Sequence, residues 1–270
     1  MLDVQPRDGL MPGYDNSFDN ESRYDLSQEE LNLLETELVE KARAMTDQEF
    51  CVAWVTPTSR FANFIRTKEV KEFPEAAEVD DYYDNHQLYL ALIDLRGEGK
   101  LVHAASIMDF DDHASDPMEA TEYDERTGFY TIDSLIARGN FTKDEFVAYY
   151  QAQGADLGSS ISVEVNFKIR KLVEPFLGLG TADLAYLSIF NALIDKGASR
   201  ENTVVFASIN EQQAKSLTRN GFRYAPLMDR TDFDTEEGEL GKDSLPVAID
   251  FSSAYDVLAP LQVKLAEIHV

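Results

Sequence analysis

The stretch Glu174-Pro175-Phe176-Leu177-Gly178-Leu179-Gly180-Thr181, which runs on to Asn220-Gly221-Phe222-Arg223-Tyr224, decides the fold of this chain. It reads as a glycine-bearing turn, a long apolar helix, a strand, a second helix and a last strand. A turn that leads into a helix can present several backbone N–H groups to an anion, because the first helical amides lack an intrahelical partner and the helix dipole is positive there. The turn therefore predicts a site for a phosphate or pyrophosphate.

Strong periodicities define the elements around this turn. Before it, apolar and polar residues alternate from Ser159 to Lys171, which is the period of a strand with one buried face. After it, the pattern predicts a buried helix over Thr181–Lys196, a strand over Thr203–Ile209, a short helix over Glu211–Arg219 and a strand over Phe222–Leu227.

Earlier and later segments complete a mixed set of elements. Ser27 and Glu30 form a capping box at the start of a helix that ends near Ala44. The pattern further predicts a strand over 50–55, a helix over 60–70, a hairpin of 87–94 with 101–108, a helix over 142–153, a strand over 245–251 and a helix over 254–268 that is interrupted at Pro260. Strands and helices do not alternate strictly, so we expect an α+β fold.

The domain organisation follows from composition. Residues 1–26 are polar and lack an apolar period, which predicts a flexible acidic arm, and we expect residues 27–270 to form a single domain. Residues 109–157 form a long insertion, a place where acceptor specificity often resides. Its acidic run 109–126 is either a solvated loop or a site for a hard cation, but it lacks the spacing of a calcium loop.

The composition limits the partners and the location. The chain has 270 residues, 44% of them hydrophobic, and a formal charge of -26, which argues against DNA or RNA as a partner. The acidity indicates either salt adaptation or a surface that attracts a cationic substrate or protein. Apolar runs such as 88–93 are too short to cross a bilayer and the first residues lack a signal-peptide pattern, so we expect a cytoplasmic protein without a membrane span.

Cysteine and histidine usage argues against several kinds of chemistry. The single cysteine, Cys51, sits in an apolar run, where a packed thiol is expected rather than a nucleophile. A Gly-x-Ser-x-Gly motif is absent and the four histidines show no triad context, which argues against a classical hydrolase. One cysteine without a His-x-x-x-His pair gives little support for zinc, so no metal is expected.

The order of elements from the hairpin to the Gly-Phe strand resembles the GNAT superfamily of acyl-CoA N-acyltransferases. In that family a turn after the fourth strand carries two small residues, and Gly178 and Gly180 fall on those positions. An Asn at the end of the fifth strand is followed eleven residues later by Gly-Phe, as Asn210 is by Gly221-Phe222. The resemblance covers about 160–228 and extends weakly to the hairpin. Residues 79–84 and the insertion are faintly similar to acyl-homoserine-lactone and N-acyl amino acid synthases.

The resemblance implies a mixed, mostly antiparallel sheet flanked by helices, with an N-terminal helical extension, and acyl-CoA as cosubstrate. The pantetheine arm would pair with the backbone of the strand 162–170, and Lys168, Arg170 and Lys171 either help to neutralise phosphates or face solvent. Asn210 would touch the cofactor, cap a helix, or do both. The cofactor-binding residues implied in this way are Asn166, Lys168, Leu177, Gly178, Leu179, Gly180, Thr181, Ala182 and Asn210.

Catalysis would be direct attack of an amine on the thioester. Glu164 is the candidate base, with a surface or ion-paired carboxylate as the alternative. Two departures from the family are visible: Pro175 replaces an Arg or Gln, and Leu217 replaces a proton-donating Tyr that many members carry. Ser216 and Thr218 flank Leu217 and are the candidate acids, although an alcohol is a weaker acid than a phenol.

The sequence therefore leaves two alternative functions. The first is an N-acyltransferase that acts on a small-molecule or protein amine. The second is a catalytically degenerate GNAT fold that serves as a ligand-binding or assembly module. The oligomeric state stays open, a homodimer included.

Overall fold

The computed structural model describes residues 25–72, 87–109, 132–133, 136, 142–152, 161–170, 174–227, 245–261 and 265–270. The expected arm at 1–26 therefore lies outside the described residues except for its last two positions, as do residues 79–84 and nearly all of the acidic run 109–126. Its main elements are α2 (Gln28–Met45), β1 (Phe50–Val55), α3 (Arg60–Glu72), β2 (Gln87–Asp94), β3 (Lys100–Asp109), α7 (Lys143–Ala152), β4 (Ile161–Arg170), α8 (Thr181–Asp195), β5 (Thr203–Ile209), α9 (Glu211–Arg219), β6 (Tyr224–Pro226), β7 (Leu245–Ile249), α10 (Phe251–Leu258), the 3₁₀ turn η3 (Ala259–Leu261) and β8 (Ala266–His269).

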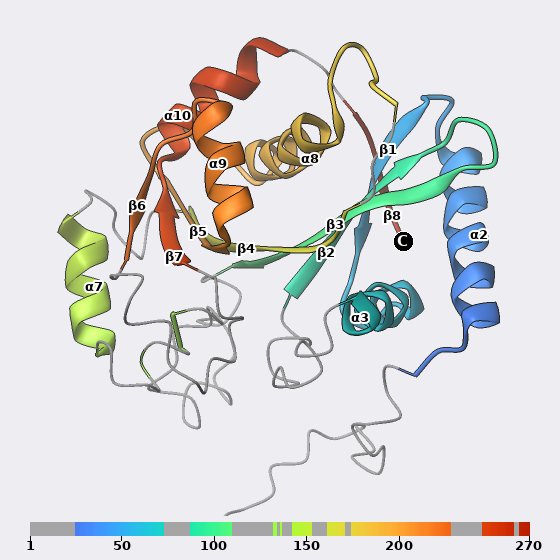
Figure 1. The fold of residues 1–270 in the computed structure, drawn as a ribbon, viewed down its shortest axis with the longest axis horizontal. Coiled ribbons are helices and arrows are strands. Elements are labelled where there is room, and N and C mark those ends of the chain that lie inside the picture. Colours follow the sequence, from blue (N-terminus) through green and yellow to red (C-terminus); the bar gives the residue numbers. More distant parts are fainter. Residues whose placement is uncertain are drawn as a thin grey trace, which may run out of the picture.

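The strands form one eight-stranded sheet in the order β6-β7-β5-β4-β3-β2-β1-β8 (Figure 1). Neighbouring strands are antiparallel except for two parallel pairs, β4 with β5 and β1 with β8. The predicted hairpin is confirmed as β2 and β3. The expected α+β class, with a mixed and mostly antiparallel sheet flanked by helices and an N-terminal helix, is confirmed as well.

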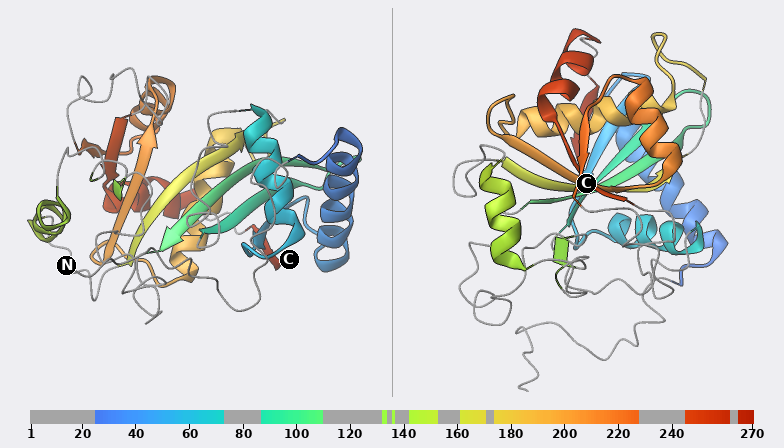
Figure 2. Two further views of the ribbon diagram at one scale, coloured as in Figure 1. Left: turned by 90° about the horizontal axis from the view of Figure 1, so that it is seen from below. Right: turned by 60° about the vertical axis from the view of Figure 1, so that its left-hand side comes forward.

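Period-two alternation gives the sheet two apolar faces. Helices α8, α9 and α10 cover one face and α2 and α3 cover the other, as the views in Figures 1 and 2 show. In β1, Phe50, Val52 and Trp54 join the core under α8–α10, while Cys51, Ala53 and Val55 join the core under α2 and α3. We call these two sides the α8 face and the α2 face. On the α2 face, α7 adds a contact of Phe146 with Phe206 of β5, with ring centroids 5.5 Å apart.

The helix starts show why these segments fold as they do. The capping box at Ser27 is confirmed, since the Ser27 hydroxyl accepts from the Glu30 amide at 3.3 Å and the Glu30 carboxylate accepts from the Ser27 amide at 2.7 Å. The Ser27 hydroxyl also donates to the Glu30 carboxylate, at 2.7 Å, and this bond together with the one from the Ser27 amide lowers the pKa of Glu30. Reciprocal bonds of this kind satisfy amides that a helix cannot pair internally.

The C-terminal end differs from the sequence prediction. The helix predicted over 254–268 is confirmed as far as Leu258, in α10, and is wrong over 266–268, which belong to β8, while the strand predicted over 245–251 ends at Ile249. Asp250 caps α10 instead, because its carboxylate accepts from the Ser252 amide at 2.9 Å, so the helix begins at Phe251. Pro260 has no N–H to continue a helix. Residues 266–269 then lie parallel to β1 and cover its edge.

Cys51 and His103 are both buried in the sheet. Cys51 is fully buried, and loss of solvation raises the pKa of its thiol to about 12, so the expectation of a packed thiol is confirmed. His103 of β3 is also buried. Within the described part of the chain, none of the helices combines the length and apolar composition that crossing a bilayer requires.

Candidate functional site

Strands β4 and β5 separate part way along the sheet, and this fork is the centre of the candidate site. They pair in parallel only from Ile161 with Thr203 to Glu164 with Phe206. Beyond Glu164, β4 continues to Arg170 along β3, while β5 continues to Ile209 along β7. The facing edges of β4 and β5 therefore no longer pair with each other beyond the fork.

A bulge in β4 lies beyond the fork. Ala104 of β3 pairs with Ile169 and Ala105 pairs with Phe167, so Lys168 is an extra residue in β4. A bulge bends a strand and increases its local twist. It therefore helps β4 to turn away from β5.

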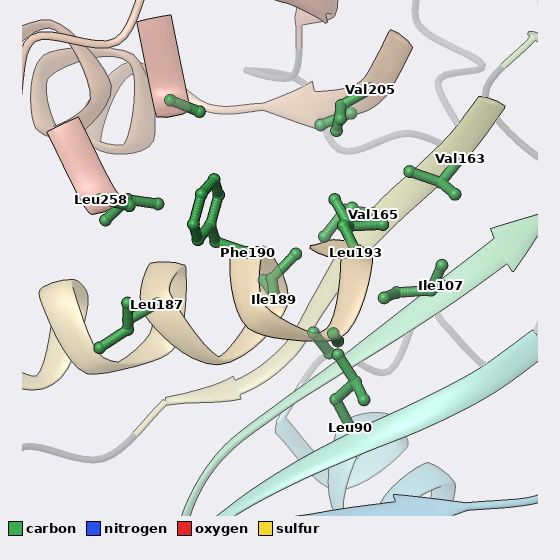
Figure 3. Packing of buried hydrophobic residues seen from close by; sticks show 14 of the residues in the cluster. Leu90, Ile107, Val163, Val165, Leu187, Ile189, Phe190, Leu193, Val205 and Leu258 are labelled. Carbon is green, nitrogen blue, oxygen red and sulfur yellow. The ribbon is translucent and has the colours of Figure 1, made fainter. Parts of the chain in front are cut away.

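An apolar cavity of about 60 Å³ lies on the α8 face beside the fork. Val165, the first residue of β4 past the last β5 pair, and Val205 of β5 contribute to its wall. Figure 3 shows Ile189 and Leu193 of α8 on the side of these two valines, and Phe190 of α8 beside Leu258 of α10. The described residues that line the cavity are Val165, Tyr186, Ile189, Phe190, Leu193, Val205, Leu217, Phe222, Ile249, Phe251, Ala254 and Leu258. All of them are apolar apart from the Tyr186 hydroxyl.

The glycine-bearing turn is a tight two-residue loop. Phe176 and Leu179 exchange two backbone hydrogen bonds, of 3.0 and 2.9 Å. The residues between them, Leu177 and Gly178, have φ values of 51° and 82°, the signs of a type I′ turn. For leucine this backbone conformation costs roughly 1–2 kcal/mol. The Leu177 side chain is 71% exposed, so packing within the chain does little to offset that cost.

Several backbone amides in the turn and just before α8 already have hydrogen-bond partners. Leu179 and Phe176 bond to each other, and the Gly180 N–H donates to the Asp183 carboxylate at 3.1 Å. In the part of the chain that the structure describes, no hydrogen bond engages the amides of Leu177, Gly178 or Ala182. Asp183 also places a negative charge at the helix N-terminus, where an anion would otherwise be favoured.

Arg96 fixes the start of this turn against the hairpin. Its guanidinium donates to the Asp94 carboxylate and, at 3.0 Å, to the Glu174 carbonyl, and it lies 4.6 Å from the centroid of the Phe50 ring. The bond to Asp94 raises the pKa of Arg96. Phe176 packs on Phe50 with centroids 4.7 Å apart. The turn is thus held in place on the side that leads out of β4.

The two predicted acids on α9, Ser216 and Thr218, differ in their exposure to solvent. Ser216 and Leu217 are buried, while Thr218 is exposed. Asn210 caps the helix, since its side-chain oxygen Oδ1 accepts a hydrogen bond from the backbone amide of Gln213 at 2.9 Å. The capping role predicted for Asn210 is confirmed, and its contact with a cofactor stays a prediction.

On the polar side of β4, the backbone positions of the predicted residues are defined. Glu164 pairs with Met108 and Phe206 next to the fork, and Asn166 pairs with Ser106. The side chains of Glu164, Asn166 and Lys168 lie outside the described part of the structure, as does Lys171 altogether. Their proposed roles stay predictions.

Tyr186 lines the cavity but is not among the residues that the sequence singled out. It lies on α8, and its hydroxyl donates to the Ser216 hydroxyl on α9 at 3.4 Å. Its ring meets the Phe222 ring edge-on, with centroids 5.1 Å apart. The available signal was a tyrosine within a largely apolar helix, because a tyrosine hydroxyl that is partly buried usually finds a polar partner.

A resident metal has no visible ligand set here. Across the described ranges, His, Cys, Asp and Glu side chains form no group of three or more that could hold an ion. The acidic run 109–126, where a cation site was the alternative to a solvated loop, lies almost entirely outside these ranges.

The sequence matches no known protein-family model, and no curated protein is detectably similar to it. Among solved structures, the AHL synthase LasI has a TM-score of 0.45 at 13% identity over 78% of this chain and 94% of its own. FeeM, an N-acyl amino acid synthase from uncultured soil microbes, has a TM-score of 0.46 at 13% identity over 81% and 98%. BjaI, a CoA-dependent acyl-homoserine lactone synthase, has a TM-score of 0.44 at 14% identity over 82% and 93%. Likenesses this distant do not establish what this chain binds or catalyses.

Proposed function

We propose that this chain transfers an acyl group from acyl-CoA to an amine. The observation that carries the proposal is the fork, where β4 and β5 stop pairing after Glu164 and Phe206. A backbone edge left without its neighbouring strand offers N–H and C=O groups to an extended ligand, and a pantetheine arm carries amides that can complete such a ladder.

The surroundings of the fork suit the two ends of such a cosubstrate. The apolar cavity beside Val165 and Val205 offers room for a short acyl group. By comparison, an engineered apolar cavity of roughly 150 Å³ accommodates benzene. At the other end, the amides of Leu177, Gly178 and Ala182 would receive the pyrophosphate, with Thr181 next to them.

The strained turn supports this assignment. Leu177 adopts a positive φ at an exposed position, and backbone strain of this kind clusters at ligand-binding sites. The chemistry proposed is attack of the amine nitrogen on the thioester carbonyl carbon, followed by loss of the thiolate. Glu164, at the fork, would accept the proton of the ammonium.

Isothermal titration with acetyl-CoA, hexanoyl-CoA and decanoyl-CoA tests the proposal. We expect binding, with the short chains preferred. Asp183→Asn should strengthen binding about three- to tenfold, because it removes a negative charge from the helix N-terminus while an amide oxygen can still accept from Gly180. The matched control is Asp195→Asn at the opposite end of α8, which should leave affinity unchanged. Absence of binding heat with all three ligands would refute the proposal.

The second candidate is a GNAT-like fold that binds acyl-CoA without turning it over. The buried Leu217, which replaces a phenol on α9, favours it. Thermal unfolding together with release of free thiol separates the two, because a ligand that binds only the native state must raise the midpoint. A raised midpoint without thiol release across a panel of amines would favour the binding module.

A further inference from the structure

We propose that the Tyr186 hydroxyl is the proton donor to the departing thiolate, an inference that rests on the proposed acyl transfer. The family resemblance places a phenol at the position of Leu217 on α9. In this chain a phenol reaches the same helix from α8, through the contact of Tyr186 with Ser216.

Tyr186 lies at the cavity beside the fork. Its side chain lines the same cavity as Val165 and Val205, the residues on the two strands that form the fork. Its ring is held edge-on against Phe222, which restricts where the hydroxyl can point. A thioester that reached the cavity along β4 would therefore bring its sulfur near this hydroxyl.

The hydroxyls of Tyr186 and Ser216 form a pair that suits proton transfer. Phenols ionise near pH 10 and thiols near pH 8.5, so a phenol can protonate a departing thiolate while an alcohol is far too weak an acid. Ser216 is buried and can rotate its O–H, so it accepts from Tyr186 at rest and can donate to the phenolate that forms. Ser216 is then a positioning residue for Tyr186.

The step balances without any further reactant. The amine nitrogen bonds to the thioester carbonyl carbon, the C–S bond breaks, and its electron pair stays on sulfur. Sulfur takes the phenolic proton of Tyr186. The proton that the new amide nitrogen loses returns to the phenolate through water, and the products are an amide and free CoA thiol.

Binding of CoA and of desulfo-CoA at pH 9 tests the contact without an acceptor. Part of the free CoA thiol is ionised at that pH, and a hydrogen bond from Tyr186 favours the ionised form, so the wild-type chain should bind CoA about tenfold more tightly than desulfo-CoA. Tyr186→Phe keeps the ring and should bring the two affinities within twofold of each other. Tyr255→Phe is the control, because Tyr255 also packs on α8, through Phe190, but does not line the cavity.

Turnover gives the second readout, with acetyl-CoA, a mixture of the common amino acids without cysteine, and release of free thiol. Tyr186→Phe should lower kcat at least 100-fold with little change in KM, and Ser216→Ala should lower it less. If Tyr186→Phe retains both the preference for CoA and the kcat, the assignment of Tyr186 is overturned and the acyl transfer stands. If the wild-type chain binds neither CoA nor desulfo-CoA, both proposals fall.

Discussion

The two faces of the sheet differ in how closely their side chains are packed. On the α2 face, Phe64 and Ile65 of α3 and Val55 of β1 are fully buried, and the Arg66–Glu69 ion pair of α3 is buried as well. On the α8 face, the core keeps a cavity beside the fork and a tyrosine hydroxyl at its wall. The same alternating strands thus supply a close-packed support on one side and space with one polar group on the other.

The largest effect expected from this contrast is on the α2 face. Phe64→Ala should lower the free energy of unfolding by about 3–5 kcal/mol, because a fully buried aromatic ring leaves a void that close packing cannot refill. Urea unfolding followed by circular dichroism measures the change. A loss below about 1 kcal/mol would show that this face is packed more loosely than we describe.

A matched pair of overpacking variants sharpens the contrast. Val55→Ile adds one methylene to β1 on the α2 face and should cost about 1 kcal/mol, because no room is left there. Val165→Ile adds the same group to β4 at the cavity wall and should leave stability unchanged or raise it. The difference between their urea midpoints is the measurement. Equal costs would contradict the distinction between the faces.

The smallest effect concerns Cys51, which lies on the α2 face. Burial raises the pKa of its thiol to about 12, so at pH 7–9 the folded chain should react with a thiol reagent only as fast as it unfolds. A Leu177→Cys variant, at an exposed position, should react at once. The raised pKa also means that the protonated Cys51 thiol contributes to the free energy of unfolding. This contribution is complete below pH 9.0 and is lost as the pH rises toward 12. Rapid labelling of Cys51 in the folded chain would count against this packing.

Local patterns predicted most of the elements but not the way in which the strands meet. Alternation in 161–170 and the capping boxes at Ser27 and Asn210 depend on neighbouring residues, so they can be read from the chain. The local pattern predicts a helix over 266–268, because the strand character of this short run comes only from the distant β1 edge. The fork depends on where the pairing of β4 with β5 ends, and the local sequence of neither strand indicates that point.

The candidate site was predictable in part for the same reason. Gly178 and Gly180 marked the turn, and Gly178 does adopt a positive φ. The positive φ of Leu177 was not foreseeable, since leucine rarely adopts it. The contact of Tyr186 with Ser216 joins residues 30 positions apart on two helices, and only their packing brings the hydroxyls together.

The pairing of β8 with β1 also bears on how the chain folds during synthesis. Trp54 of β1 donates to Glu267 of β8, and the two residues are 213 positions apart. A ribosome adds roughly 5–20 residues per second, so β1 waits on the order of ten seconds or more for this partner. During that time its edge can pair with other strands. Chaperones that shield apolar strands should therefore bind the nascent chain until residues 266–269 have emerged.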